Sequence, residues 1–268
     1  MLTISLKDIS PSLLVALRFS LGTLIMALIL RSKLLQLRRT DIIAGFFTGT
    51  CIFLGYFLQT VGLQWIPSSI SAFLTALYVP FVPLLQWLIL RRAPGFITTT
   101  GILVAFFGMM LIINPFSFSL VGNLGECLTV ASAVACAMEI IVIGKYANDC
   151  DPKVFCFTQL FFVSLYAILY CCFFEEVRFT PTPASLLSLA GLVGIIVFNQ
   201  CGISWAQKQV SPVRAVLIYS LEPVFAGLIG VLVGEKFTTM AAIGAVLVLS
   251  SVLITSFLPK YLQERAKN

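Results

Sequence analysis

The sequence predicts an all-α membrane protein, a helical bundle of nine transmembrane helices built from two inverted repeats of four and five helices. Of its 268 residues, 59% are hydrophobic and only 10% are charged, and the mean hydropathy is +1.04. A soluble domain of this size does not carry so large an apolar fraction. A helix needs about 20 mostly apolar residues to span a bilayer, and nine such segments follow one another along the chain.

Short connections join the predicted spans and leave no room for a separate extramembrane domain. The spans are 11–30, 41–63, 67–90, 97–114, 122–143, 152–173, 183–206, 211–233 and 238–258. The first four form a repeat over 1–115, the last five form a repeat over 122–258, and 259–268 form a cytoplasmic tail. Because the fifth span has no counterpart in the first half, we expect the first repeat to lack its first helix. A start codon assigned too late and a chain that works with nine helices both explain this.

The repeat becomes visible when the chain is shifted against itself. A shift of 143 residues aligns 62–111 with 205–254 without a gap. The identical pairs are Gln64 with Gln207, Ser68 with Ser211, Ala72 with Ala215, Leu74 with Leu217, Pro80 with Pro223, Leu85 with Leu228 and Gly101 with Gly244. A shift of 141 aligns Pro11 with Pro152, each at the start of a span. A repeat with an odd number of helices reverses its orientation in the bilayer, which is typical of secondary transporters.

The basic residues indicate how the chain is oriented. When the loops alternate along the nine spans, thirteen of the 17 lysines and arginines fall on one side, three fall on the other, and Arg18 lies within a span. The positive-inside rule makes the richer side cytoplasmic. We therefore expect a multi-pass protein of the cell (inner) membrane with its N-terminus outside and its C-terminus in the cytoplasm. The formal charge of +6 is then an orientation signal and does not indicate nucleic-acid binding.

The last two spans carry a recognisable series of residues. The run Leu221-Glu222-Pro223-Val224-Phe225-Ala226 is followed by Gly230, by Gly234-Glu235-Lys236 and by Gly244. This series resembles the EamA-like family of the drug/metabolite transporter superfamily. In the first half, Pro80, Gly101 and Gly108 look like its paired version, and Pro11 with Leu17-Arg18-Phe19 looks like the family's second helix.

The resemblance covers nearly the whole chain and carries expectations of its own. It implies an inner-membrane carrier of ten helices for small metabolites such as amino acids, of which this chain lacks the first helix. One departure is that Arg91-Arg92 stands where the first repeat of the family often has Gly-Glu.

Three charged residues lie within predicted spans, where each costs about 2.5–3.5 kcal/mol at the centre of an isolated helix. Arg18 is about 10 Å deep at 1.5 Å per residue and is a candidate fork for a substrate carboxylate or phosphate; a buried ion pair between helices is the alternative. Glu222 precedes Pro223 and is a candidate for binding an amine or a coupling proton, or for a fixed pair with Arg18 or Arg214. Glu139 is expected to reach the cytoplasmic interface.

Amides, tyrosines and prolines complete the predicted site. Gln159 aligns with Arg18 in the repeat, and Gln200 is a second buried amide. Prolines at matching depths in the two halves indicate kinked helices that face each other, where transporter sites commonly form. The predicted substrate-binding residues are Arg18, Gln159, Tyr219, Glu222, Gln200 and Tyr78, and the predicted helix breaks are at Pro80, Pro83 and Pro223.

These features predict a secondary transporter that moves small metabolites by alternating access, with amino acids and related zwitterions favoured. The sequence has no Gly-x-x-x-x-Gly-Lys-[Ser/Thr] motif, so transport follows a gradient, an exchange partner or a coupled proton. The chain has no histidine and only isolated acids, so we expect no enzyme, metal site or cofactor. Its expected partners are a small-molecule substrate and the lipid bilayer.

Two other interpretations stay open at this point. The protein is alternatively a non-transporting membrane scaffold or truncated remnant, or an exporter of hydrophobic cations or drugs, for which Glu222 and aromatic side chains would suffice. Small residues at close-packing spacing, such as Gly45 with Gly49, mark helix contacts. These contacts lie within the bundle or, in a homo-oligomer, between subunits.

Overall fold

The computed structural model describes residues 8–91, 95–113, 123–174, 179–180, 182–232 and 238–265. Their helices are α2 (Pro11–Leu30), the 3-10 helix η1 (Arg31–Gln36), α3 (Arg39–Gly62), α4 (Ser68–Thr75), α5 (Tyr78–Leu90), α6 (Phe96–Ile113), α7 (Leu124–Tyr146), α8 (Pro152–Phe174), α9 (Pro183–Ala206), α10 (Pro212–Tyr219), α11 (Glu222–Leu232) and α12 (Thr239–Arg265). Within these ranges, β structure is limited to one isolated bridge between Ile9 and Phe179. Arg92, Gly234-Glu235-Lys236 and the last three residues of the predicted tail lie outside the described residues.

The predicted all-α membrane bundle is confirmed. Each predicted span contains one helix or two successive helices, α4 with α5 and α10 with α11. Seven stretches of the described chain are long and apolar enough to cross a membrane, and Ile70–Ile89 combines most of α4 and α5 into one of them. Several helices begin with a proline, as α2 does at Pro11 and α8 at Pro152. A proline fits there because the first turn of a helix does not need its missing N–H group.

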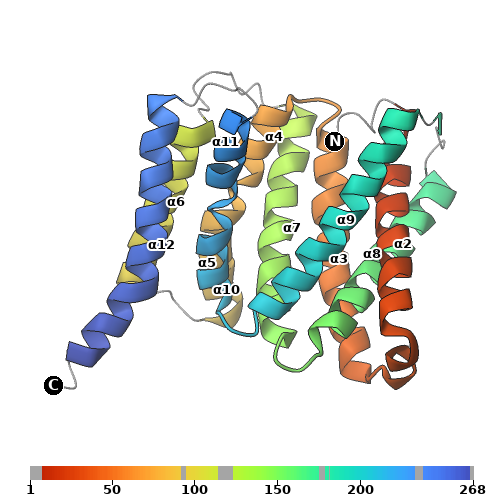
Figure 1. Cartoon of the computed structure of the whole chain (residues 1–268), viewed down its shortest axis with the longest axis horizontal. Helices are drawn as coiled ribbons and strands as arrows, with labels where there is room; N and C mark the ends of the chain where they lie inside the picture. Colours follow the sequence, from red (N-terminus) through yellow and green to blue (C-terminus); the bar gives the residue numbers. More distant parts are fainter. Residues whose placement is uncertain are drawn as a thin grey trace.

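The two halves of the chain run in opposite directions. In Figure 1, α2 descends while α8 rises, and α3 rises while α9 descends. The same reversal relates α4–α5 to α10–α11 and α6 to α12, whereas α7 has no counterpart among the described helices. The arrangement is that of two repeats with inverted topology.

Two of the spans are broken at their centre. Ala76 and Leu77 lie between α4 and α5, and the N–H group of Leu77 donates to the carbonyl oxygen of Leu74 at 3.2 Å. Leu221 occupies the same place between α10 and α11 and donates to Ile218 at 3.1 Å. These short turns redirect the chain and free backbone groups in the middle of the bundle, which membrane proteins tolerate where the groups are buried in protein or line a cavity.

The prolines predicted to break helices take different positions around these turns. Pro80 lies in the first turn of α5 and Pro223 in the first turn of α11, so neither removes a helical hydrogen bond. Pro83 lies inside α5. The turns bring Tyr78 to the start of α5 and Glu222 to the start of α11.

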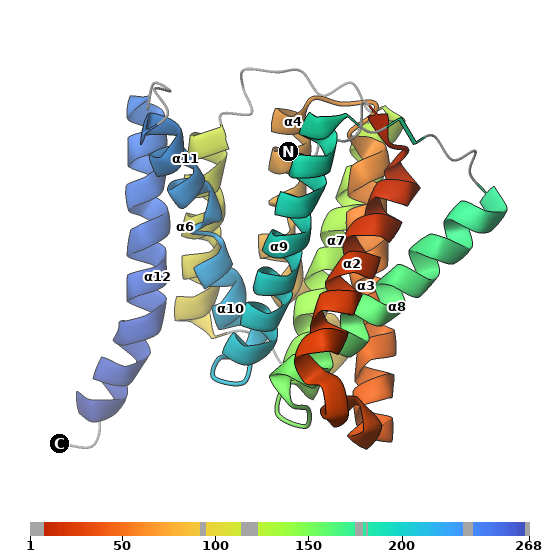
Figure 2. The same cartoon turned by 45° about the vertical axis from the view of Figure 1, so that its right-hand side comes forward.

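Helices α6 and α12 form a close pair at one side of the molecule (Figures 1 and 2). A Cβ atom at Gly108 or Gly244 would collide with the carbonyl oxygen of the other residue. Ser251 Oγ also donates to the carbonyl oxygen of Gly101 at 2.6 Å. Small residues let the two backbones approach, as is common between transmembrane helices.

The two equivalent helices α3 and α9 differ in the elements that cover them. Helix α3 packs on α7 through Gly55 and Gly62, while α9 packs mainly on α2 and α8. The shift of 143 residues aligns these glycines with Phe198 and Trp205 of α9, which are 83% and 63% exposed. Gly202 on the same face has no atom of another element within 4 Å of where a Cβ would stand. The face of α9 that corresponds to the α7-contacting face of α3 is therefore exposed.

Candidate functional site

Arg18 lies in the interior of the bundle, in the middle of α2. It is 4% exposed, and its guanidinium carbon is 5.1 Å from the ring centre of Phe19 and 4.7 Å from that of Tyr56 on α3. Cation–π contacts stabilise the charge by about 0.5–2 kcal/mol each. Among the described residues, Nε and Nη2 find no hydrogen-bond acceptor, and no carboxylate lies within ion-pair distance. A buried guanidinium with free N–H groups is suited to binding an anion.

The two predicted amides are fully buried near the same part of the bundle. Gln159 on α8 donates through Nε2 to Ser204 Oγ on α9 at 3.4 Å. Gln200, also on α9, donates through Nε2 to Glu139 Oε1 on α7 at 3.1 Å. The carbonyl oxygens of both amides lack a hydrogen-bond partner among the described residues. Each amide therefore retains an acceptor for a ligand or a proton donor.

Glu139 lies deeper than its position in the sequence suggests. It is 7% exposed and bonded to Gln200, so the expectation that it reaches the cytoplasmic interface is wrong. The segment that precedes it, from Ala131 to Ala137, consists mainly of alanine with serine, valine and cysteine. Such small side chains let neighbouring helices approach closely and bury the next turn of α7. This run of small residues is the sequence signal that could have identified the buried carboxyl group.

A second group of predicted residues gathers at the two helix breaks. Tyr219, the last residue of α10, accepts a hydrogen bond from Gln207 Nε2 at 3.4 Å. Tyr78 interacts electrostatically with both Tyr219 and Glu222. The side chain of Glu222 is exposed. The breaks thus place two phenols and one carboxyl group close together.

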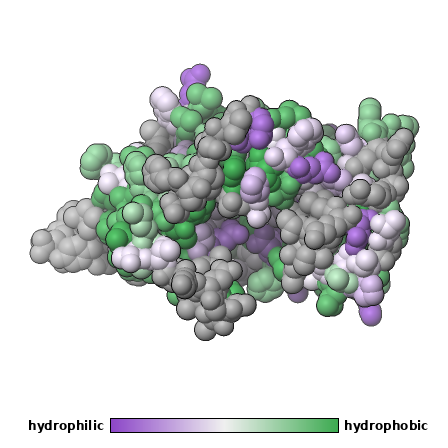
Figure 3. Space-filling view, turned by 90° about the horizontal axis from the view of Figure 1, so that it is seen from above, coloured by the Kyte–Doolittle hydropathy of each residue, from purple (hydrophilic) through white to green (hydrophobic). Residues whose placement is uncertain are grey.

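Tyr56 connects the two groups. It interacts electrostatically with Glu139, Arg18 and Glu222, which belong to α7, α2 and α11. Figure 3 looks onto the end that is uppermost in Figure 1 and shows hydrophilic residues in a recess between hydrophobic flanks. The described residues contain no group of three or more His, Cys, Asp or Glu side chains that could hold a metal ion. The arrangement offers one cation, two carboxyl groups, amides and phenols for recognising a small polar molecule.

At the lower end in Figure 1, side chains tie α3 to the turn between α7 and α8. Arg38 pairs with the buried Asp41 at 3.4 Å, and its Nη2 donates to the carbonyl oxygen of Asp149 at 2.7 Å. Cys150 in the same turn is 2% exposed. Burial, together with the neighbouring Asp41, raises the pKa of its thiol to about 12. The bond from Arg38 to Asp149 joins the first repeat to the second, while the pair with Asp41 orients Arg38 at the start of α3.

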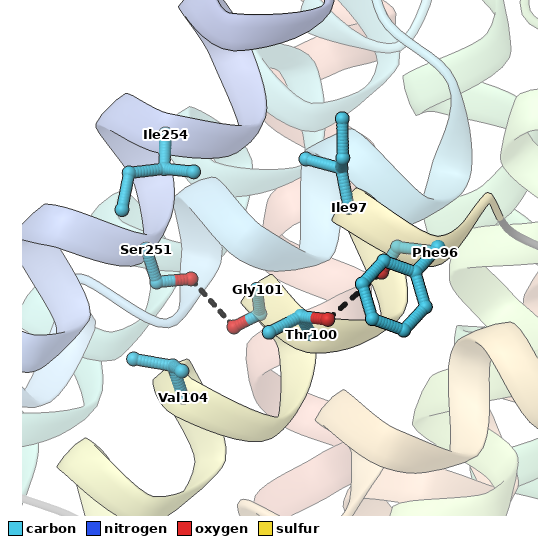
Figure 4. A pocket seen from close by; sticks show the side chains of 7 residues that line it. All are labelled: Phe96, Ile97, Thr100, Gly101, Val104, Ser251 and Ile254. Atoms are coloured by element: carbon cyan, nitrogen blue, oxygen red, sulfur yellow. Dashed lines mark hydrogen bonds between the residues drawn. The ribbon is translucent and has the colours of Figure 1, made fainter.

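A separate pocket lies between α6 and α12 and includes none of the predicted site residues (Figure 4). Its lining is almost wholly apolar. The hydroxyl groups of Ser251 and Thr100 are bonded to the carbonyl oxygens of Gly101 and Phe96, at 2.6 and 3.0 Å. These hydroxyl groups already donate their protons within the protein, so the pocket offers little to orient a polar ligand.

Comparison with known proteins shows which family the chain resembles. Residues 1–114 and 123–257 each match the model of the EamA-like transporter family. An uncharacterized transporter of Archaeoglobus fulgidus is 30% identical over 222 residues, which cover 82% of this chain and 70% of that protein. The uncharacterized transporter YyaM of Bacillus subtilis is 27% identical over 280 residues, 94% of this chain and 87% of that protein. A crystal structure with 16% sequence identity has a TM-score of 0.77 and covers 96% of this chain and 92% of its own.

Proposed function

Because the chain belongs to the EamA-like transporter family, we propose that it is a secondary transporter that carries small zwitterionic metabolites, amino acids above all, by alternating access. Family membership makes it a multi-pass membrane transporter for a small molecule. The substrate class and the mechanism are proposed from the site.

The proposal rests on the N–H groups of the buried Arg18 that are unbonded within the described part of the chain. A buried arginine with a purely structural role has its N–H groups paired, because an unpaired charge in a low-dielectric interior is costly. The guanidinium of Arg18 is held between aromatic rings, with Nε and Nη2 unbonded among the described residues. A carboxylate that binds these two groups forms the bidentate pair for which arginine is suited.

The carboxyl groups support a substrate that also carries a positive charge. Glu139 and Glu222 both interact with Tyr56, which also contacts the guanidinium of Arg18. An amino acid places its carboxylate and its ammonium group on one carbon. It would therefore occupy the space near Tyr56 with the carboxylate at Arg18 and the ammonium group toward Glu222, with Tyr78 and Tyr219 around it.

The inverted repeats support alternating access. Two halves of like design and opposite orientation exchange conformations when the cavity opens first to one side and then to the other. The hydrogen bond from Arg38 to the carbonyl oxygen of Asp149 holds the lower end together, while the hydrophilic recess lies at the upper end (Figure 3). By the positive-inside rule the lower end is cytoplasmic, so this conformation corresponds to an outward-facing state in the cell membrane.

The two repeats are proposed to occupy 1–115 and 122–258, with the first repeat one helix shorter. The exposed face of α9 at Phe198 and Trp205 supports this, because the equivalent face of α3 is covered by α7.

Counterflow in proteoliposomes tests the function. Vesicles with the purified protein are loaded with unlabelled protein amino acids and then given a radiolabelled mixture of the same compounds. We expect exchange by the wild type and by Arg214→Ala, which removes an exposed positive charge from α10, and none by Arg18→Ala. A parallel assay uses hydrophobic cations inside and outside the vesicles, and exchange of these cations alone would support the exporter hypothesis instead. If no labelled compound is exchanged, the protein is not a carrier of these substrates.

A further inference from the structure

We infer that Glu139 and Gln200 form a proton-binding site, and that the proton held there is the coupling ion of transport. The coupling rests on the proposed transport function, whereas the proton site can be tested without any substrate. The inference follows from three observations on these two side chains.

The first observation is the burial of a lone carboxyl group. Glu139 is 7% exposed and lies in α7 seven residues before the end of the helix at Tyr146, about 10 Å from that end at 1.5 Å per residue. No lysine or arginine of the described residues lies within ion-pair distance of it. An ionised carboxylate at this depth is costly unless it is paired, and a proton removes that cost.

The second observation is the hydrogen bonding of the amide beside it. Gln200 is fully buried and gives one N–H group to Glu139 Oε1 at 3.1 Å, while its own carbonyl oxygen has no donor among the described residues. A protonated carboxyl group has one O–H group to donate. A carboxylic acid and a primary amide are therefore complementary, since each offers one donor and one acceptor. The protonated pair satisfies the amide oxygen, which an ionised Glu139 cannot do.

The third observation is that the groups nearest to Glu139 carry no fixed charge that would hold it permanently in one protonation state. Cys51 and Tyr56 on α3, Cys136 on α7 and Tyr219 on α10 interact with it electrostatically. Thiols and phenols have reference pKa values well above 7 and contribute no fixed charge.

The charged groups nearby act indirectly. Tyr56, which interacts electrostatically with Glu139, also interacts with Arg18 on α2 and with Glu222 on α11. The charge on Glu139 can therefore respond to the occupation of Arg18. A substrate carboxylate at the guanidinium places negative charge near Tyr56 and favours the protonated form of Glu139, so substrate and proton bind together. When the substrate is released on the other side of the membrane, the proton returns to water and Glu139 is left ionised.

Infrared difference spectroscopy of the purified protein in liposomes tests the proton site. Between acid and alkaline buffers, the carbonyl stretch of a protonated carboxylic acid should be lost from the wild type and from Glu222→Gln. The other carboxyl groups of the chain contribute to the same signal, so Glu139→Gln, which has the shape of the protonated side chain, should lack one component of this band, that of the buried Glu139. In Gln200→Met the band should shift in frequency, because the amide partner has gone. A Glu139→Gln spectrum identical to that of the wild type would overturn the inference.

Transport measurements test the coupling separately. The probe is the radiolabelled mixture of protein amino acids, given to proteoliposomes with and without an acid exterior. One pH unit across the membrane is worth about tenfold accumulation for one coupled proton. We expect this response in the wild type and in Arg214→Ala, and we expect Glu139→Gln to exchange amino acids without it. A wild type that exchanges amino acids but ignores the pH gradient refutes the coupling. A wild type without exchange refutes the proposed function and the coupling with it, and the infrared result then decides on the proton site.

Discussion

Replacing Arg18 by methionine should separate stability from transport. The side chain is 4% exposed, and Nε and Nη2 make no hydrogen bond among the described residues. Exchanging an unpaired buried charge for an apolar side chain of similar length removes a desolvation cost. Even the replacement of a buried ion pair by hydrophobic residues is often neutral or stabilising by about 1–4 kcal/mol. We therefore expect Arg18→Met to melt at the same temperature as the wild type or higher.

The same substitution should abolish substrate binding. Two hydrogen bonds to a charged carboxylate are worth about 1.5–3 kcal/mol each, or about 3–6 kcal/mol together. At about 1.4 kcal/mol per tenfold change, the affinity for an amino acid falls by two to four orders of magnitude. Arg18→Lys keeps the charge but loses the fork, so it should retain only part of the affinity.

Thermal unfolding in detergent and counterflow in proteoliposomes measure the two effects on the same preparations. The reasoning is refuted if Arg18→Met lowers the free energy of unfolding by about 3–5 kcal/mol, the cost of breaking a buried ion pair. Arg18 would then be a structural residue. Unchanged exchange kinetics in the mutant would equally remove Arg18 from the site.

Two further predictions concern the packing and the lower end of the molecule. Gly244→Val should destabilise the protein by about 1–3 kcal/mol, because its Cβ meets the carbonyl oxygen of Gly108; thermal unfolding should show this loss, while Gly202→Ala, in open space on α9, should unfold like the wild type or at a higher temperature. Arg38→Ala should speed the labelling of Cys150 by a membrane-impermeant maleimide in inside-out vesicles, because it removes the bond that holds the turn at Asp149 against α3. In the wild type Cys150 is 2% exposed, and burial raises the pKa of its thiol to about 12. Reaction requires the thiolate, so the wild type should label slowly at neutral pH and faster as the pH rises toward that value. Equal labelling rates in both proteins would show that Arg38 does not hold this end closed.

The sequence predicts the positions of the helices well because the hydropathy of a segment largely decides whether it spans the membrane. Each predicted span coincides with one helix or a broken pair, and prolines such as Pro11 and Pro152 mark helix starts. The resemblance to the EamA-like family is confirmed by matches over both halves of the chain. The breaks themselves were predicted only through prolines, and the structure places them before Pro80 and Pro223, while Pro83 continues a helix.

The environment of each polar residue was harder to predict. In a membrane both the lipid-facing and the buried sides of a helix are apolar, so hydrophobic periodicity does not show which way a side chain points. Glu139 illustrates this, because distance along the chain suggested the interface and the packing of α7 buries it. Gln200 was recognised as a buried amide, but its bond to Glu139 joins residues 61 positions apart and has no signature in the sequence.

The pair α6–α12 has a consequence for how the molecule can move. The shift of 143 residues maps Gly108 onto Ser251 and Gly244 onto Gly101. The contact between Gly108 and Gly244 is thus the image of the bond between Ser251 and Gly101, and both are present at once. The α6–α12 contact therefore stays the same when the two halves exchange conformations. In the alternating-access mechanism proposed above, the contact between α6 and α12 would stay intact while the remaining helices tilt about it.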